Sequence, residues 1–155
     1  MWFTFQISSF LPSRVHSTFY SRLTEGPRGY DYDWVDRWTK KSNVADVFVH
    51  DLILVPINLP NHWALVAIDF RAHRIVYYDS STEASEQLRL AKSLKPCAAL
   101  EKWCDDEMRT KKRQRFDWFG WRTHVHGLSP QQTNGFDCGV FMCQCLRGLM
   151  TGSAH

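Results

Sequence analysis

The sequence predicts an α+β fold built on a single core. Two long apolar runs rich in β-branched residues, at 52–59 and 63–70, indicate strands that are buried on both faces, and a third run follows at 74–78. Pro56 cannot donate to a strand ladder, so it predicts that the first run lies at an edge or a bulge. Strands and helices do not alternate strictly along the chain, which favours α+β over α/β.

Helices are predicted on both sides of these strands. Residues 30–41 are predicted to form one helix, because Trp34 and Trp38 lie four residues apart and the acidic residues come before the basic ones. A second helix is predicted at 83–94, capped by Ser81 or Thr82 and stopped by Pro96. A third helix is predicted at 98–112, and a fourth strand at 121–125.

Composition bounds the kind of protein. A chain of 155 residues with 44% hydrophobic residues is long enough and apolar enough to fold as one globular domain. A net charge of +3 is mild and does not indicate a nucleic-acid partner. Five cysteines leave at least one free thiol, which favours a reducing compartment. No secretory leader is predicted in residues 1–12, and no apolar run is long enough to cross a bilayer, so we expect an intracellular, soluble chain.

Two weaker signals leave alternatives open. The basic run at 111–115 fits a nuclear-localisation signal or a phosphate-binding patch, and equally a solvated helix end. Several cysteines and histidines could suggest zinc, but their spacings match no familiar zinc site, and we predict no metal and no cofactor. These residues are Cys97, Cys104, Cys143, Cys145, His124 and His126.

A cysteine at the start of the last predicted helix is a candidate nucleophile. The loop 129–137 is rich in Pro, Gln, Asn and Gly, and a helix is predicted from Cys138 to about residue 149. Free N–H groups and the helix dipole at such a position favour a thiolate. We expect Gly135 and Gly139 to allow a sharp turn and a close approach of substrate. The plainer interpretation of Cys138 is a small core residue.

A thiolate nucleophile needs a base and a group that orients the base. His62 lies at the mouth of one predicted strand, and Asp79 ends the next one. If those strands pair, both side chains come out at neighbouring sheet ends. Taken singly, His62 would be a loop histidine and Asp79 a turn-forming residue.

The combination of motifs resembles the SUMO-specific (sentrin-specific, ubiquitin-like-protein) protease family. The matching blocks are 37–41, 51–59, His62-Trp63-Ala64-Leu65, Tyr77-Tyr78-Asp79-Ser80 and the run 130–139, which reads PQQTNGFDCG. They occur in the family's order over roughly residues 12–150, and His62 and Asp79 are 17 residues apart, as in the family pattern. Because several separate motifs agree, the resemblance is highly specific.

The resemblance implies a papain-like cysteine protease core, with a mixed central sheet flanked by helices and Cys138 at the N-terminus of a buried helix. In this comparison Cys138 is the nucleophile, His62 the general base and then acid, and Asp79 the group that orients the imidazole. Gln132 matches the oxyanion-hole glutamine.

The resemblance also implies residues that bind substrate. Trp63 matches a ring beside a narrow tunnel for a Gly-Gly tail, and a tunnel of that width excludes side chains. Arg37, Trp38 and Gly139 are further substrate-binding candidates.

The chain departs from the family at both ends. The family domain usually opens with a Trp-Leu-Asn/Asp-Asp motif and a long helix, and it continues well past the cysteine helix to another helix. Trp2 lies too close to the 16–19 segment to replace the first Trp. We therefore predict a divergent segment at 1–11, a catalytic domain at 12–150 without the usual first and last helices, and a tail at 151–155.

The function implied is a cysteine-type isopeptidase or C-terminal hydrolase that cleaves after the Gly-Gly of SUMO, in deSUMOylation or in precursor processing. A protease for another ubiquitin-like modifier such as NEDD8, and an inactive truncated relic that binds SUMO, remain as alternatives. The expected partner is SUMO or a related modifier with its conjugates, without nucleic acid or membrane. We expect a monomer that resides in the nucleus, with a cytoplasmic share left open.

Overall fold

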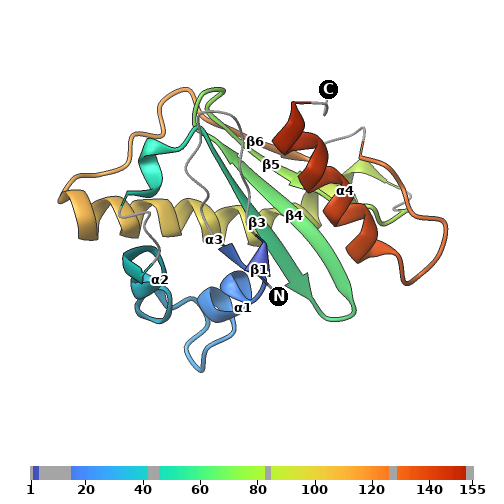
Figure 1. Cartoon of the computed structure of the whole chain (residues 1–155), viewed down its shortest axis with the longest axis horizontal. Helices are drawn as coiled ribbons and strands as arrows, with labels where there is room; N and C mark the ends of the chain where they lie inside the picture. Colours follow the sequence, from blue (N-terminus) through green and yellow to red (C-terminus); the bar gives the residue numbers. More distant parts are fainter. Residues whose placement is uncertain (1, 4–14, 42–45, 83–84, 126–128, 153–155) are drawn as a thin grey trace.

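The computed structural model describes residues 2–3, 15–41, 46–82, 85–125 and 129–152. Its centre is a four-stranded sheet in the order β3-β4-β5-β6 (Figure 1). The strands are β3 (Leu52–Leu59), β4 (His62–Asp69), β5 (Arg74–Tyr78) and β6 (Arg122–Val125). β3, β4 and β5 pair antiparallel, whereas β6 runs parallel to β5. This mixed sheet with flanking helices confirms the predicted α+β fold class.

The other elements surround this sheet. They are β1 (Trp2–Phe3), β2 (Val15–His16), α1 (Phe19–Thr24), η1 (Tyr32–Trp34), α2 (Asp36–Lys41), η2 (Val47–Val49), α3 (Glu86–Lys112) and α4 (Cys138–Thr151). Among the described residues, no helix combines the length and the apolar character needed to cross a membrane.

The three predicted strands form almost where the apolar runs placed them. β3 and β5 have the predicted bounds, and β4 begins one residue earlier, because His62 pairs with Leu59 across the turn. In the described sheet β3 is an edge strand, which accounts for the tolerance of Pro56. The middle of both β3 and β4 is buried, as the continuous apolar runs predicted.

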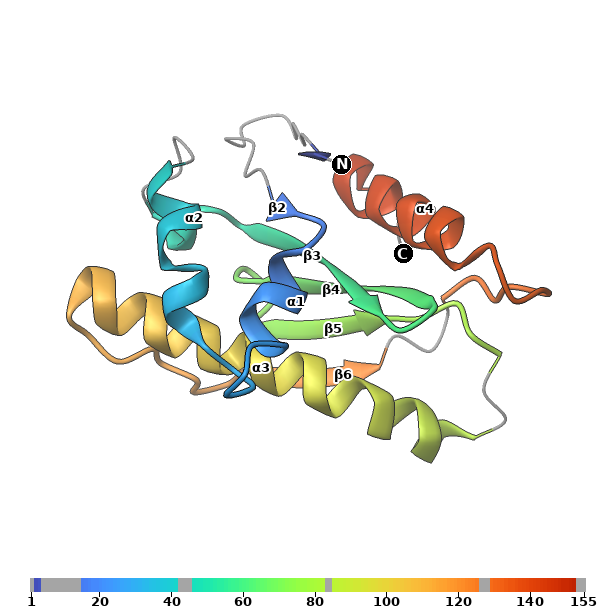
Figure 2. The ribbon, with the colours of Figure 1, turned by 90° about the horizontal axis from the view of Figure 1, so that it is seen from below.

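Helices cover the two faces of the sheet. α4 lies on one face and α3 on the other (Figure 2). On the α4 face, Met142 and Leu146 pack against a buried cluster that includes Leu65 and Tyr78. On the α3 face, the core cluster includes Leu100, and it also takes in aromatic side chains of α1. The two clusters are separate, so truncating a side chain in one of them would leave a void in that cluster alone.

The two helices predicted at 83–94 and 98–112 are a single helix, so that prediction was wrong. α3 runs from Glu86 to Lys112 and contains Pro96. Proline in a helix interior loses one hydrogen bond and costs about 3 kcal/mol. Pro96 is buried and followed by the buried residues Cys97 and Leu100, so tertiary packing outweighs that cost. The cap is Ser85, whose side chain accepts from the Leu88 N–H, and it is neither Ser81 nor Thr82.

The single helix predicted at 30–41 is also wrong, because the structure has the 3₁₀ turn η1 and then α2. The Asp31 side chain accepts from the Asp33 N–H and caps the first turn. Val35 separates the two turns and is fully buried. The two tryptophans consequently have different surroundings, since Trp34 is exposed under the Arg22 guanidinium and Trp38 packs edge-on against Phe19.

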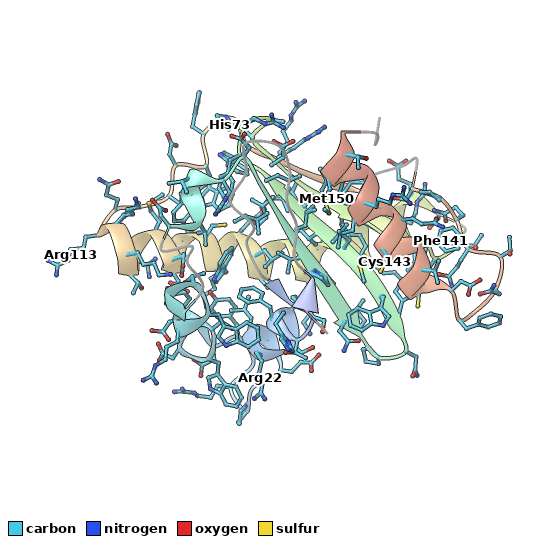
Figure 3. The ribbon with its side chains drawn as sticks, in the orientation of Figure 1. Arg22, His73, Arg113, Phe141, Cys143 and Met150 are labelled. Carbon is cyan, nitrogen blue, oxygen red and sulfur yellow. The ribbon has the colours of Figure 1, made fainter. Side chains whose placement is uncertain are left out.

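Much of the basic run at the end of α3 is engaged in ion pairs. Lys111 binds the fully buried carboxylate of Glu107 and the Thr39 hydroxyl, and Lys112 pairs with Asp46. Arg113 lies at the end of α3 that points away from α4 (Figure 3). These contacts support a structural role for the run, in which α3 is tied to the N-terminal third of the chain.

Candidate active site

His62 and Asp79 are in direct contact at one end of the sheet. β4 begins at His62, and Asp79 directly follows β5. Leu65 faces Tyr78 across the β4–β5 ladder. Continuing that register by one pair would set Asp79 opposite Ala64, on the same face as His62. The His62 Nε2 atom lies 2.7 Å from the Asp79 Oδ1 atom.

The Asp79 carboxylate is buried and held by several donors. Its side chain is only 5% exposed, against 19% for His62. Oδ1 also accepts from the Ser81 N–H at 2.8 Å, and Oδ2 accepts from the Tyr77 hydroxyl at 3.3 Å. Burial by itself would raise the pKa of Asp79. The hydrogen bonds from His62 and Ser81 outweigh burial and lower the pKa to about 2. Asp79 is therefore ionised at neutral pH.

An ionised Asp79 determines the tautomer of His62. A carboxylate only accepts hydrogen bonds, so Nε2 carries a hydrogen and donates it to Oδ1. In the neutral ring the proton-accepting nitrogen is then Nδ1, which is the atom left to exchange a proton with another group.

Cys138 is the first residue of α4, and its side chain is buried. The turn before it is held by Asn134, whose Oδ1 accepts from the N–H groups of Phe136 and Asp137 and whose Nδ2 donates to the Asp137 carboxylate. Asp137 itself makes no side-chain cap bond. The Asp137 carboxylate therefore does not cap the N–H groups of the first turn, and the partial positive charge of the helix start lies at Cys138.

Contrary to the prediction, the backbone at Gly135 and Gly139 does not adopt a conformation that requires glycine. Neither Gly135 nor Gly139 has a positive φ, since the described glycines with that conformation are Gly29, Gly120 and Gly152. Gly135 has open space around it. At Gly139 an added Cβ would lie 3.5 Å from the Trp63 ring. Two of the predicted substrate-binding residues, Gly139 and Trp63, are therefore neighbours next to Cys138.

Gln132 is buried and linked to the end of β5. Its Oε1 accepts from the Ser80 hydroxyl at 2.7 Å, and its Nε2 donates to the Asn134 carbonyl at 2.6 Å. The backbone adds a bond from the Gln132 N–H to the Ser80 carbonyl at 2.8 Å. Gln132 thus lies between the residue after Asp79 and the turn that starts α4.

The remaining predicted site residues lie elsewhere. Arg37 and Trp38 belong to α2, which lies at the opposite end of the molecule from the β3–β4 turn and the start of α4 (Figures 1 and 2). Arg37 is exposed, and Trp38 packs against His16 and Phe19. The structure does not bring them to the His62–Asp79 pair, and a substrate role for them requires a protein-sized partner that spans both regions.

The cysteines outside the candidate site show no metal-binding arrangement in the described parts of the chain, where no group of three or more potential ligands gathers. His126 lies outside the described residues. All five cysteines are free thiols. Burial raises the pKa of Cys97 to about 12 and that of Cys104 well above its ordinary value, so both are unreactive.

Sequence reasoning missed three residues that support the site. Tyr77 and Ser80 fall in a quoted motif, but they read there as a strand residue and a turn residue. Asn134 reads as part of a polar loop. The Ser80–Gln132 contact joins residues 52 positions apart, which no local pattern reveals, whereas Tyr77 and Asn134 contact Asp79 and Gln132 within their own segments.

A hairpin that presents a His–Asp pair beside a cysteine-headed helix is the framework of papain-like cysteine peptidases, and the α+β fold belongs to that class. A family model described as "Ulp1 protease family, C-terminal catalytic domain" matches residues 2–155. The chain belongs to this family.

Curated relatives agree with the family match. Sentrin-specific protease 2 of Homo sapiens is 37% identical over an alignment of 134 positions, and the match covers 84% of this chain and 20% of the human protein. Sentrin-specific protease 5 of Mus musculus is 36% identical over an alignment of 144 positions, and the match covers 88% of this chain and 17% of the mouse protein. The chain spans only 16% to 38% of the lengths of the first relatives it matches.

Solved structures agree with the fold. The SUMO protease Ulp1 with its catalytic cysteine oxidised to a sulfonic acid is 30% identical, with a TM-score of 0.71. The Ulp1 protease domain in complex with Smt3, the yeast orthologue of SUMO, is 32% identical, with a TM-score of 0.68. Each match covers 90% of this chain and 56% of the solved chain.

Proposed function

We propose that this chain is a cysteine-type isopeptidase and C-terminal hydrolase that cleaves after the Gly-Gly of SUMO. The observation that carries the proposal is the 2.7 Å contact between His62 and the ionised Asp79, together with the closeness of Trp63, the residue after His62, to Gly139, the residue after Cys138. The family match and a relative solved in complex with a SUMO orthologue support SUMO as the substrate. The catalytic domain is proposed to occupy residues 12–150.

In the first half of the proposed reaction, the Cys138 thiol passes its proton to His62 Nδ1, and the resulting thiolate attacks the carbonyl carbon of the terminal glycine. A C–S bond forms, and the carbonyl π electrons move to the oxygen. The side chain of Gln132 and the Cys138 backbone N–H are the proposed donors to that oxyanion. When the intermediate collapses, the C–N bond breaks and the leaving amine takes the proton held on His62 Nδ1.

In the second half, water hydrolyses the thioester. His62 Nδ1 accepts a proton from the water as its oxygen attacks, and the C–S bond breaks to release SUMO with a free carboxylate. Throughout, Asp79 keeps the imidazole oriented through Nε2 and stabilises its positive charge without taking the proton.

Substrate selection is proposed to rest on the small gap beside the nucleophile. Trp63 lies against Gly139, directly after Cys138, and any side chain on residue 139 would contact the ring. A tail of two glycines, with no side chains, suits such a confined approach. Arg37 and Trp38 are proposed to contact the folded body of the modifier.

The test is labelling with SUMO that carries an electrophilic C-terminal warhead, followed by mass spectrometry. We expect one adduct on Cys138, loss of labelling in Cys138→Ala, and unchanged labelling in the matched control Cys143→Ala on the same helix. An adduct on Cys97 or Cys143 in the unmodified chain would contradict the assignment.

Two alternatives are separated by a parallel hydrolysis assay with fluorogenic SUMO, NEDD8 and ubiquitin. Faster cleavage of NEDD8 than of SUMO identifies the modifier as NEDD8. Binding of SUMO without labelling or cleavage identifies an inactive binding module. Nuclear residence is also proposed, and imaging of the tagged chain with and without Arg113→Gln and Arg115→Gln, which spare Lys111 and Lys112, would test the role of the 111–115 run.

A further inference from the structure

Ser80 stands between two parts of the candidate site. It directly follows Asp79, and its hydroxyl lies 2.7 Å from Gln132 Oε1. Both side chains are buried, with 6% of Ser80 and 8% of Gln132 exposed. A hydrogen bond between two buried neutral groups restrains their rotation more than an exposed one does, because no water competes for either partner.

The neighbours of Gln132 determine which way its amide faces. The Asn134 carbonyl, 2.6 Å from the amide, can only accept a hydrogen bond, so the atom facing it must be the nitrogen. The oxygen then faces Ser80, whose hydroxyl donates. A flipped amide would place two oxygens against each other at Asn134. Ser80 and Asn134 together hold the amide in one orientation.

We propose that Ser80 is a positioning residue that keeps the Gln132 amide ready to donate to the oxyanion. This inference rests on the proposed function. An amide nitrogen carries two hydrogens, and one of them is used by Asn134, so the second is available to the substrate oxygen. Without the Ser80 hydroxyl, Oε1 is buried without a donor and the amide can rotate to find another one.

The geometry also joins the two halves of the catalytic machinery. Asp79 and Ser80 are consecutive, so the end of β5 orients the imidazole through one residue and the oxyanion donor through the next. The backbone bond between Gln132 N–H and Ser80 carbonyl, and the bond from the Thr82 hydroxyl to the Gln132 carbonyl at 2.8 Å, hold the segments together independently of the Ser80 hydroxyl. Ser80→Ala should therefore free the amide and leave the segment in place.

The experiment is a double-mutant cycle with Ser80→Ala and Gln132→Ala on hydrolysis of a fluorogenic SUMO substrate. We expect Ser80→Ala to lower kcat roughly tenfold with little change in KM, since it removes one of the two hydrogen bonds that hold the amide. In the Gln132→Ala background, Ser80→Ala should have no further effect. Ser80→Thr, which keeps the hydroxyl, should restore most of the rate. Thr82→Val is the matched control, expected to stay within about twofold.

A second readout separates positioning from damage to the thiolate–imidazole pair. Alkylation of Cys138 by iodoacetamide forms no oxyanion, so its rate should be the same in Ser80→Ala and the parent chain. Equal hydrolysis rates for Ser80→Ala and the parent chain would overturn the inference. A loss of rate in Ser80→Ala that adds to the loss in Gln132→Ala would also overturn it.

A third readout does not need activity. The side-chain amide signals of Gln132 in a ¹⁵N–¹H spectrum are assigned by their loss in Gln132→Ala, and we expect Ser80→Ala to shift them. If the parent chain cleaves no modifier, the proposed function fails. If these signals are unmoved by Ser80→Ala, the positioning of the amide by Ser80 fails, whatever the activity.

Discussion

Asp79→Asn tests the site with the smallest change in shape. The carboxylate accepts from His62 at 2.7 Å and from the Ser81 N–H at 2.8 Å through one oxygen, and from the Tyr77 hydroxyl through the other. An asparagine can keep its oxygen on the first two donors and turn its NH₂ toward Tyr77, whose hydroxyl can also accept. The substitution therefore fits the cavity but removes the charge that stabilises a protonated imidazole.

The pKa of Asp79 gives the size of the stability effect. Its pKa is about 2, against an ordinary value of 3.8, and this difference favours the charged form by about 2 kcal/mol. That is an upper limit for the stability lost at neutral pH, because asparagine keeps some of the hydrogen bonds. The catalytic loss should be larger, on the order of 10²–10⁴ in kcat, as for the equivalent change in a serine-protease triad.

The assays are calorimetric unfolding and SUMO hydrolysis, both run against pH. Because folding lowers the pKa of Asp79, its stabilising contribution is complete above 3.8 and is lost as pH falls toward 2. The difference in unfolding free energy between the parent chain and Asp79→Asn should therefore shrink below about pH 4. A kcat within tenfold of the parent, or a stability difference that grows as pH falls, would refute the reasoning.

Three further substitutions probe other parts of the molecule. Lys111→Met leaves the fully buried Glu107 carboxylate without its cation and should lower the free energy of unfolding by about 3 kcal/mol. We expect calorimetry to show a Tm lower by roughly 10 °C, and a change under about 2 °C would contradict this. Burial lowers the pKa of His50, so the folded protein is fully stable with respect to this group above about pH 6.5 and loses stability as pH drops below that value. His50→Gln should therefore flatten the decline of Tm between pH 7 and pH 5. An unchanged slope would exclude His50 as the cause of that decline. Trp63→Ala should lower kcat/KM for SUMO roughly 30-fold while iodoacetamide alkylates Cys138 at the parent rate, and a slower alkylation would mean that the ring supports the nucleophile instead.

The strands and the His62–Asp79 pair could be predicted because their signals are local. Continuous apolar runs broken by short turns mark β3, β4 and β5 within one residue. Once adjacent strands are taken to pair, the start of β4 and the end of β5 must lie side by side at one end of the sheet. Strand pairing alone makes the adjacency of His62 and Asp79 plausible, and the family resemblance is what assigned the two residues to one site.

The continuous α3 could not be predicted, because the signal at Pro96 is local and the force that overrides it is not. Proline marks a helix stop in isolation. Here Pro96 is buried, and its neighbours Cys97 and Leu100 belong to the core that α3 shares with the sheet and α1. The same holds for Glu107, which reads as a solvated helix residue and is instead buried with Tyr32 and Lys111. The Tyr32 partner lies 75 residues away in sequence, so the burial of Glu107 becomes apparent only in the folded structure.

The site depends on parts of the chain that contribute no chemistry. Residues 79–82 meet 131–134 through the bonds of Ser80 and Thr82 to Gln132, although the whole of α3 and β6 lies between these segments in sequence. β6 pairs with β5, and α3 packs beneath both, so the return of the chain to the end of β5 requires that these elements fold. Weakening α3 at Lys111 should therefore reduce activity only in proportion to the folded fraction, with KM unchanged. Removing the Ser80 hydroxyl, which bonds the Gln132 side chain, should instead lower the activity of molecules that remain folded.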